Sequence, residues 1–228
     1  MKLVIFDCDG TLVDSQHNII AAMTWAFREH GLPPPSRPAV LRCVGLSLPE
    51  TFAVLAANHP ASVRRSLAAH YRDAFVLGPL RRREQEEIYP GIRETIAALA
   101  ARPDVALGVA TGKSKRGVDR LFRQEDWHSH FQTVQTADDH PSKPDPSMIA
   151  KAMAETGVRP EATVMVGDTS FDMTMAGNAG VGAIGVGWGY HDTTELVAAG
   201  AHEIVTEGSR LLAAIESRLQ RQIVEGVR

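Results

Sequence analysis

Residues 3–11 read LVIFDCDGT, so four apolar residues run directly into two aspartates, Asp7 and Asp9, that are one residue apart. A short and fully apolar run that ends at such a turn sequence is typical of a buried parallel strand. Alternate residues of an extended segment project to the same side. The stretch therefore predicts a central strand that presents two carboxylates together at its end.

Similar apolar runs recur along the chain and alternate with helical patterns. The further runs are Val105–Ala110, Thr163–Val166, Ala183–Val186 and the shorter Glu203–Val205. Helical spacing is found over Gly91–Ala101, Ser114–Gln124, Pro146–Gly157, Phe171–Ala179, Thr193–Ala199 and the tail Ser209–Val224. This alternation predicts an α/β fold with a doubly wound, Rossmann-like parallel sheet.

One region, residues 16–87, breaks the alternation. Its apolar residues have helical spacing, and the prolines at Pro33–Pro35, Pro38 and Pro60 divide it into segments. We expect an all-α domain inserted after the first strand. The predicted domains are then residues 1–15 with 88–228, which form the sheet, and residues 16–87, which form the insert.

Composition limits the partners and the location. The chain has 228 residues and a formal net charge of −3, which gives no electrostatic reason to expect nucleic acid or an anionic membrane. No apolar run approaches the ~20 residues of a membrane span, and the four before Asp7 are too few for an export signal. With two cysteines only, Cys8 and Cys43, we expect no disulfide framework and a cytoplasmic protein, either a monomer or a homodimer.

The unusual polar residues follow predicted strands, where ligands of doubly wound sheets bind. If Asp7, Asp9 and Asp168 meet there, each close carboxylate pair costs about 4 kcal/mol at ~4 Å and an effective dielectric constant of ~20. Raised pKa values, a metal ion or Lys143 would have to offset this cost. All candidate ligands are oxygens, and an oxygen-only site favours Mg²⁺.

Thr111 and Gly112 lie where a predicted strand leads into a helix. A hydroxyl and free backbone N–H groups at such a place suit a phosphate group. The neighbouring Lys113 could bind phosphate or extend into solvent, and of the two we expect solvent. A metal, a lysine, a hydroxyl and amides are what phosphoryl transfer requires. One aspartate of the pair could then form an aspartyl phosphate, while the other protonates the leaving oxygen and later activates water.

Four motifs in this order resemble those of the haloacid dehalogenase superfamily of phosphohydrolases, and within it the phosphoglycolate-phosphatase-like members that carry an inserted helical cap. They are Asp7-Cys8-Asp9-Gly10-Thr11, Thr111, Lys143 within KPDP, and Gly167-Asp168 with Asp172. The resemblance extends over essentially the whole chain. It implies that residues 16–87 are the cap and that the sheet domain is the catalytic core.

The resemblance also implies a role for each motif residue. Asp7 would be the nucleophile and Asp9 the acid and base. Mg²⁺ would be held by Asp7, by the backbone carbonyl of Asp9 and by Asp168, with Asp172 acting from outside the ligand set or through a ligand water. Thr111, Gly112 and Lys143 would bind the transferring phosphoryl group.

The implied activity is Mg²⁺-dependent hydrolysis of a small phosphorylated metabolite, with 2-phosphoglycolate as the leading substrate. A sugar-phosphate mutase, an inorganic pyrophosphatase and a non-catalytic binding module are the alternatives. Caps of this kind resemble each other in having a loop that faces the substrate, and Arg42 and Ser47 lie at the position of that loop. The segment Trp188–His191 is expected to pack against the cap or the core.

Overall fold

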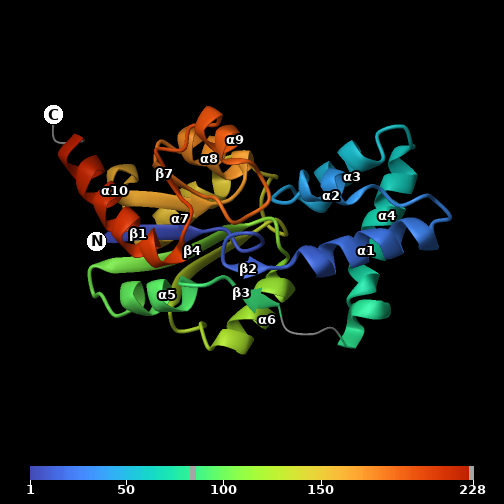
Figure 1. Ribbon diagram of the computed structural model, residues 1–228, viewed down its shortest axis with the longest axis horizontal. Helices are drawn as coiled ribbons and strands as arrows, with labels where there is room; N and C mark the ends of the chain where they lie inside the picture. Colours follow the sequence, from blue (N-terminus) through green and yellow to red (C-terminus); the bar gives the residue numbers. More distant parts are fainter. Residues whose placement is uncertain (83–85, 226–228) are drawn as a thin grey trace.

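The computed structural model describes residues 1–82 and 86–225. A parallel six-stranded sheet in the order β5-β4-β1-β6-β7-β8 forms its centre (Figure 1). Its strands are β1 (Lys2–Phe6), β4 (Val105–Thr111), β5 (Phe131–Thr136), β6 (Thr163–Gly167), β7 (Gly182–Val186) and β8 (Glu203–Val205). The predicted doubly wound α/β fold is confirmed.

Helices cover both faces of the sheet. One apolar cluster joins the sheet to α5 (Ile92–Ala100), α6 (Lys115–Glu125) and α10 (Leu211–Glu225). The other joins it to α7 (Ser147–Thr156), α8 (Ser170–Asn178) and α9 (Thr193–Ala198). Among the residues that the structure describes, no helix combines the length and apolar character needed to cross a membrane.

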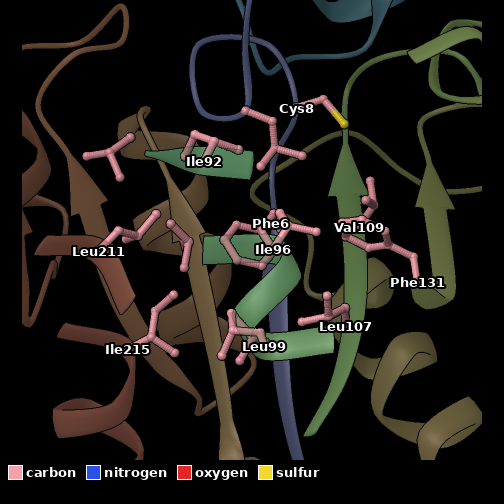
Figure 2. Close-up of a cluster of buried hydrophobic side chains, with 14 of the residues drawn as sticks. Phe6, Cys8, Ile92, Ile96, Leu99, Leu107, Val109, Phe131, Leu211 and Ile215 are labelled. Atoms are coloured by element: carbon pink, nitrogen blue, oxygen red, sulfur yellow. The ribbon is translucent and has the colours of Figure 1, made fainter. Parts of the chain in front are cut away.

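Strand β1 shows why the opening stretch is apolar throughout. Val4 and Phe6 pack into the first cluster, whereas Leu3 and Ile5 pack into the second. A strand buried on both faces needs apolar residues at every position. Cys8 continues the first set and is buried beside Phe6, as Figure 2 shows. The cysteine thus faces the core, as its alternation with the aspartates predicts.

The sequence analysis missed strand β5. It lies at the edge of the sheet and pairs with β4 alone. Four of the six residues in its sequence, FQTVQT, are polar, and Gln132 is exposed while the neighbouring side chains are buried or half-buried. An edge strand tolerates polar residues because one side has no partner strand, so this segment lacks the continuous apolar run used to find the others.

The insert after β1 contains helices α1 (Gln16–Glu29), α2 (Arg37–Leu41), α3 (Leu48–Leu55) and α4 (Ala61–Ala74), which stand to one side of the sheet (Figure 1). They enclose an apolar cluster of their own that includes Met23, Phe27, Phe52 and Leu67. The two connections to the sheet domain pair as antiparallel strands, β2 (Val13–Asp14) and β3 (Glu87–Ile88). The division into two domains stays a prediction, and residues 83–85 of the insert lie outside the described residues.

Candidate active site

The carboxyl ends of three neighbouring strands bring the predicted motif residues together. Asp7 follows β1, Thr111 ends β4, and Asp168 follows β6. Lys143 comes from the loop before α7, and its Nζ lies 3.1 Å from Asp7 Oδ1 and 2.6 Å from Asp172 Oδ1. All of these side chains are buried. Segments far apart in the sequence therefore converge at one sheet edge, as predicted.

Asp172 is fixed by the start of α8 as well as by the lysine. Its Oδ2 accepts hydrogen bonds from the backbone N–H of Thr169 at 3.1 Å and from the Thr169 hydroxyl at 2.7 Å. Thr169 Oγ1 in turn accepts from the Asp172 backbone N–H, which completes a capping box. Asp172 is thus a capping residue and also the closest carboxylate to Lys143.

Asp168 lies in a tight cradle. Its Oδ1 accepts a hydrogen bond from the Thr11 hydroxyl at 2.8 Å, and its Oδ2 accepts one from the Tyr190 backbone N–H at 2.9 Å. A Cβ on either Gly10 or Gly189 would lie 2.2 Å from an atom of Asp168. Both glycines are therefore needed for the backbone to approach this carboxylate closely.

The carboxylates of Asp7, Asp168 and Asp172 form one group, with an oxygen of each within 4.8 Å of the others. Burial raises the pKa of Asp7 from 3.8 to about 6; Lys143 opposes this rise and Asp172 adds to it. Burial, Asp7 and Asp172 likewise hold the pKa of Asp168 well above its usual range. Burial lowers the pKa of Lys143, but Asp172 and Asp7 more than compensate, so its net pKa is raised.

One oxygen of this group has no hydrogen-bond partner within residues 1–82 and 86–225. Asp7 Oδ1 accepts a hydrogen bond from the Cys8 backbone N–H at 2.7 Å and faces Lys143, whereas Asp7 Oδ2 is buried without a hydrogen-bond partner among the described residues. Buried carboxylate oxygens are normally paired or bound to a metal. When all are ionised, three carboxylates and one lysine leave two negative charges. An unpaired oxygen in such a group fits a divalent cation that prefers oxygen ligands.

Asp9 lies apart from that group. Its Oδ1 is 2.6 Å from Nζ of Lys113, whose other partner is Glu86 Oε2 at 3.2 Å. The Lys113 side chain is only 10% exposed, so the expectation that it extends into solvent is wrong. Sequence reasoning missed its importance because its partners are 104 and 27 residues away.

The phosphate-binding candidates Thr111 and Gly112 lie at the end of β4, where the insert approaches the sheet domain. Thr111 is fully buried, and its hydroxyl accepts a hydrogen bond from the Lys113 backbone N–H at 3.2 Å. A Cβ at Gly112 would lie 2.7 Å from the carbonyl oxygen of Gly45 in the insert. Glycine at position 112 thus permits the insert to contact this strand end.

The structure places the two predicted cap residues at this same junction. Arg42 Nη2 lies 2.5 Å from Oε1 of Glu195 on α9, and the arginine side chain is 66% exposed. The Ser47 backbone N–H donates to the Ser142 hydroxyl at 2.8 Å, one residue before Lys143. Both residues thus join the insert to the sheet domain, and their contact with substrate stays a prediction.

The segment Trp188–His191 follows β7 and packs against the core beside the site. The Trp188 indole lies near Tyr89 and donates to the Thr11 carbonyl at 3.2 Å. The Tyr190 hydroxyl lies 3.3 Å from Ser15 Oγ. The sequence indicated the packing, but it gave no signal that the Tyr190 backbone would hold Asp168.

Comparisons with known proteins identify relatives of this chain. A protein of Dickeya dadantii named "Probable phosphatase IndB" is 36% identical over 96% of this chain and 95% of its own length. A phosphoglycolate phosphatase of Pseudomonas putida is 32% identical over 83% of this chain and 71% of its own length. The solved structure of a haloacid dehalogenase-like hydrolase from Streptococcus pneumoniae shares the fold, with a TM-score of 0.80 and 24% identity over 94% of this chain and 98% of that one. Residues 4–186 match the model of the haloacid dehalogenase-like hydrolases, and the chain belongs to that family.

Proposed function

We propose that this enzyme is a Mg²⁺-dependent phosphatase of small phosphomonoesters that works through an aspartyl phosphate on Asp7. The observation that carries the proposal is the state of the Asp7 carboxylate. Its Oδ1 is held by Cys8 N–H and Lys143, while its Oδ2 is buried and accepts no hydrogen bond from the residues that the structure describes. A carboxylate that is oriented through one oxygen and free at the other is suited to nucleophilic attack.

In the first step, Asp7 Oδ2 attacks phosphorus and the bond from phosphorus to the ester oxygen breaks. Asp9 gives a proton to that oxygen, which leaves as an alcohol. In the second step, water attacks the aspartyl phosphate while Asp9 takes one of its protons. The bond between phosphorus and Asp7 breaks, which releases inorganic phosphate, restores the Asp7 carboxylate and leaves Asp9 protonated, as it was before the first step.

Lys143 and Thr111 lie where they can contact the transferring phosphoryl group. Lys143 contributes a positive charge beside Asp7, and Thr111 contributes a hydroxyl at the end of the neighbouring strand. The carboxylates of Asp7 and Asp168 and the backbone carbonyl of Asp9 would hold the metal ion, with Asp172 acting from outside the ligand set or through a ligand water. When bound, Mg²⁺ neutralises negative charge on the phosphoryl oxygens.

Residues 16–87 would act as a cap that covers this site and excludes water during the reaction. Contacts of the cap with both Gly112 and Ser142 support the proposal, because Gly112 is itself a phosphoryl-binding candidate beside Thr111 and Ser142 adjoins Lys143. If Ser47 faces the substrate, Ser47→Ala will change the relative kcat/KM across a panel of esters. Equal changes for every ester would argue against that role.

The leading substrate is 2-phosphoglycolate, and the proposal is supported by relatives named phosphoglycolate phosphatase, such as the Pseudomonas putida protein. The test is phosphate release from a panel of phosphorylated metabolites with Mg²⁺ and with EDTA. Wild-type protein should act on an ester only with the metal, and Asp7→Asn should be inactive. A fully active Asp7→Asn variant would overturn the mechanism.

The same panel separates the alternatives. A mutase would give isomerisation that depends on a bisphosphate, with little free phosphate, and a pyrophosphatase would prefer inorganic pyrophosphate to every ester. A binding module would release no phosphate from any compound. The motif residues are all present in this chain, which favours a catalyst over a binding module.

A further inference from the structure

Lys113 is the nearest charged partner of the proposed acid and base. Its Nζ lies 2.6 Å from Asp9 Oδ1, and both side chains are almost fully buried. The Lys113 chain lies against the first turn of α6, where a Cβ on Gly117 would be 2.8 Å from Lys113 Cγ. The lysine is therefore confined to a narrow path between that helix and Asp9.

Glu86 holds the other side of this lysine. Its Oε2 is 3.2 Å from Lys113 Nζ, and its side chain is 6% exposed. Asn18 of α1 donates to Glu86 Oε1 at 3.1 Å, and Gln124 of α6 donates to the Glu86 backbone carbonyl at 3.0 Å. Glu86 is thus fixed by the insert and by the sheet domain, and it fixes Lys113 in turn.

We infer that Lys113 is a positioning residue that holds the Asp9 carboxylate in place for proton transfer, with Glu86 keeping the lysine there. The ion pair engages Asp9 Oδ1, so Oδ2 is left to carry the proton to and from the reacting oxygens. Without Lys113, the Asp9 side chain would be free to rotate away from the leaving oxygen. This inference rests on the proposed phosphatase function.

The chemistry of the leaving group provides the test. An alkoxide must be protonated as it leaves, whereas p-nitrophenolate leaves readily without a proton. We would measure kcat/KM for an alkyl phosphate, 2-phosphoglycolate, and for p-nitrophenyl phosphate. This ratio covers the steps up to release of the leaving group, so hydrolysis of the aspartyl phosphate does not enter it.

Lys113→Met should lower kcat/KM for the alkyl ester by about 10–100-fold, a part of the ~10²–10⁴-fold that acid–base catalysis supplies, and change it by less than about 3-fold for p-nitrophenyl phosphate. Lys113→Arg, which keeps the charge, should recover much of the loss. Lys115→Met is the matched control, because that lysine is 61% exposed and pairs with Asp119 on the helix surface. In an Asp9→Asn background, Lys113→Met should cause no further selective loss.

Each outcome decides the inference. Equal losses for both esters in Lys113→Met would overturn it, since they would show that Lys113 binds the phosphoryl group or only supports the fold. If Lys113→Met does not fold, Glu86→Gln replaces it as the test and should lower kcat/KM more for the alkyl ester than for p-nitrophenyl phosphate, by a smaller factor. Equal effects of Glu86→Gln on both esters would also overturn the inference. Wild-type protein inactive on both esters would instead refute the proposed function and this inference with it, whereas an active wild type with unselective variants would refute the inference alone.

Discussion

The buried Asp7 carboxylate should make the metal-free protein less stable as the pH rises. Burial raises the pKa of Asp7 from 3.8 to about 6, so the folded state keeps a proton that the unfolded state has already lost. Stability falls with pH wherever the folded state binds more protons. The contribution of Asp7 is therefore fully present below about pH 4 and is lost as the pH rises through about 6.

Each tenfold change in the acidity constant corresponds to about 1.4 kcal/mol. The change from 3.8 to about 6 then amounts to about 3 kcal/mol of unfolding free energy from Asp7. The raised pKa of Asp168 acts in the same direction. A cation bound by these carboxylates favours their ionised form, so Mg²⁺ should stabilise the protein more at pH 8 than at pH 5.

The assay is urea denaturation followed by circular dichroism in EDTA, between pH 4 and 8, on wild-type protein and Asp7→Asn. The asparagine cannot ionise, so the variant should be more stable than wild type by about 1–3 kcal/mol near pH 8 and should lose this advantage near pH 4. The exposed Asp126 provides the control, and Asp126→Asn should change the free energy by less than about 0.5 kcal/mol. Identical pH curves for wild type and Asp7→Asn would refute the reasoning.

Three further changes test other parts of the site. Lys143→Met should lower the free energy of unfolding by about 3–5 kcal/mol in urea denaturation in EDTA, because it leaves buried carboxylates unpaired. The control Lys151→Met should leave that free energy nearly unchanged, because the ion pair of Lys151 is half-exposed. Gly189→Ala should weaken Mg²⁺ binding by about 10–100-fold in calorimetry, since the added Cβ would lie 2.2 Å from Asp168. The control Gly177→Ala should bind Mg²⁺ normally, because the added Cβ would lie in open space. Arg42→Ala should lower the free energy of unfolding by less than about 1 kcal/mol, because the ion pair of Arg42 is exposed. It should also change the relative kcat/KM across a panel of esters, and unchanged relative values would show that Arg42 does not contact the substrate.

The sequence predicts those strands that can be recognised from their own residues, without knowledge of their neighbours in the fold. Strand β1 is apolar from Leu3 to Phe6 because both of its faces are covered, and β4, β6 and β7 contain similar runs, with polar residues only at the strand ends. Strand β5 has no such run, since its edge position permits glutamine and threonine. The first group can be recognised without its neighbours, whereas β5 is defined by its pairing with β4.

The same distinction applies to the site. Asp7, Lys143 and Asp168 could be assigned to one edge because each follows or precedes a recognisable element. The burial of Lys113 could not be predicted, because it is decided by Asp9 and Glu86 from distant segments. A lysine after Thr111-Gly112 looks the same in sequence whether it faces solvent or an ion pair.

Charge explains why the two aspartates of the first motif have separate surroundings. Asp9 and Glu86 are matched by Lys113 and by Arg120, whose Nη2 lies 3.9 Å from Glu86, so this group is neutral when all four are ionised. The group around Asp7 instead has three carboxylates and one lysine, which leaves two negative charges.

One divalent cation would balance that excess at Asp7, whereas the group around Asp9 carries no net charge for a cation to balance. We therefore expect the side chain of Asp9 to transfer protons, and its proposed part in metal binding falls to its backbone carbonyl. The two aspartates of the first motif thus lie in one group with excess negative charge and one neutral group. In the proposed mechanism, that separation would allow one carboxylate to attack phosphorus while the other transfers the proton.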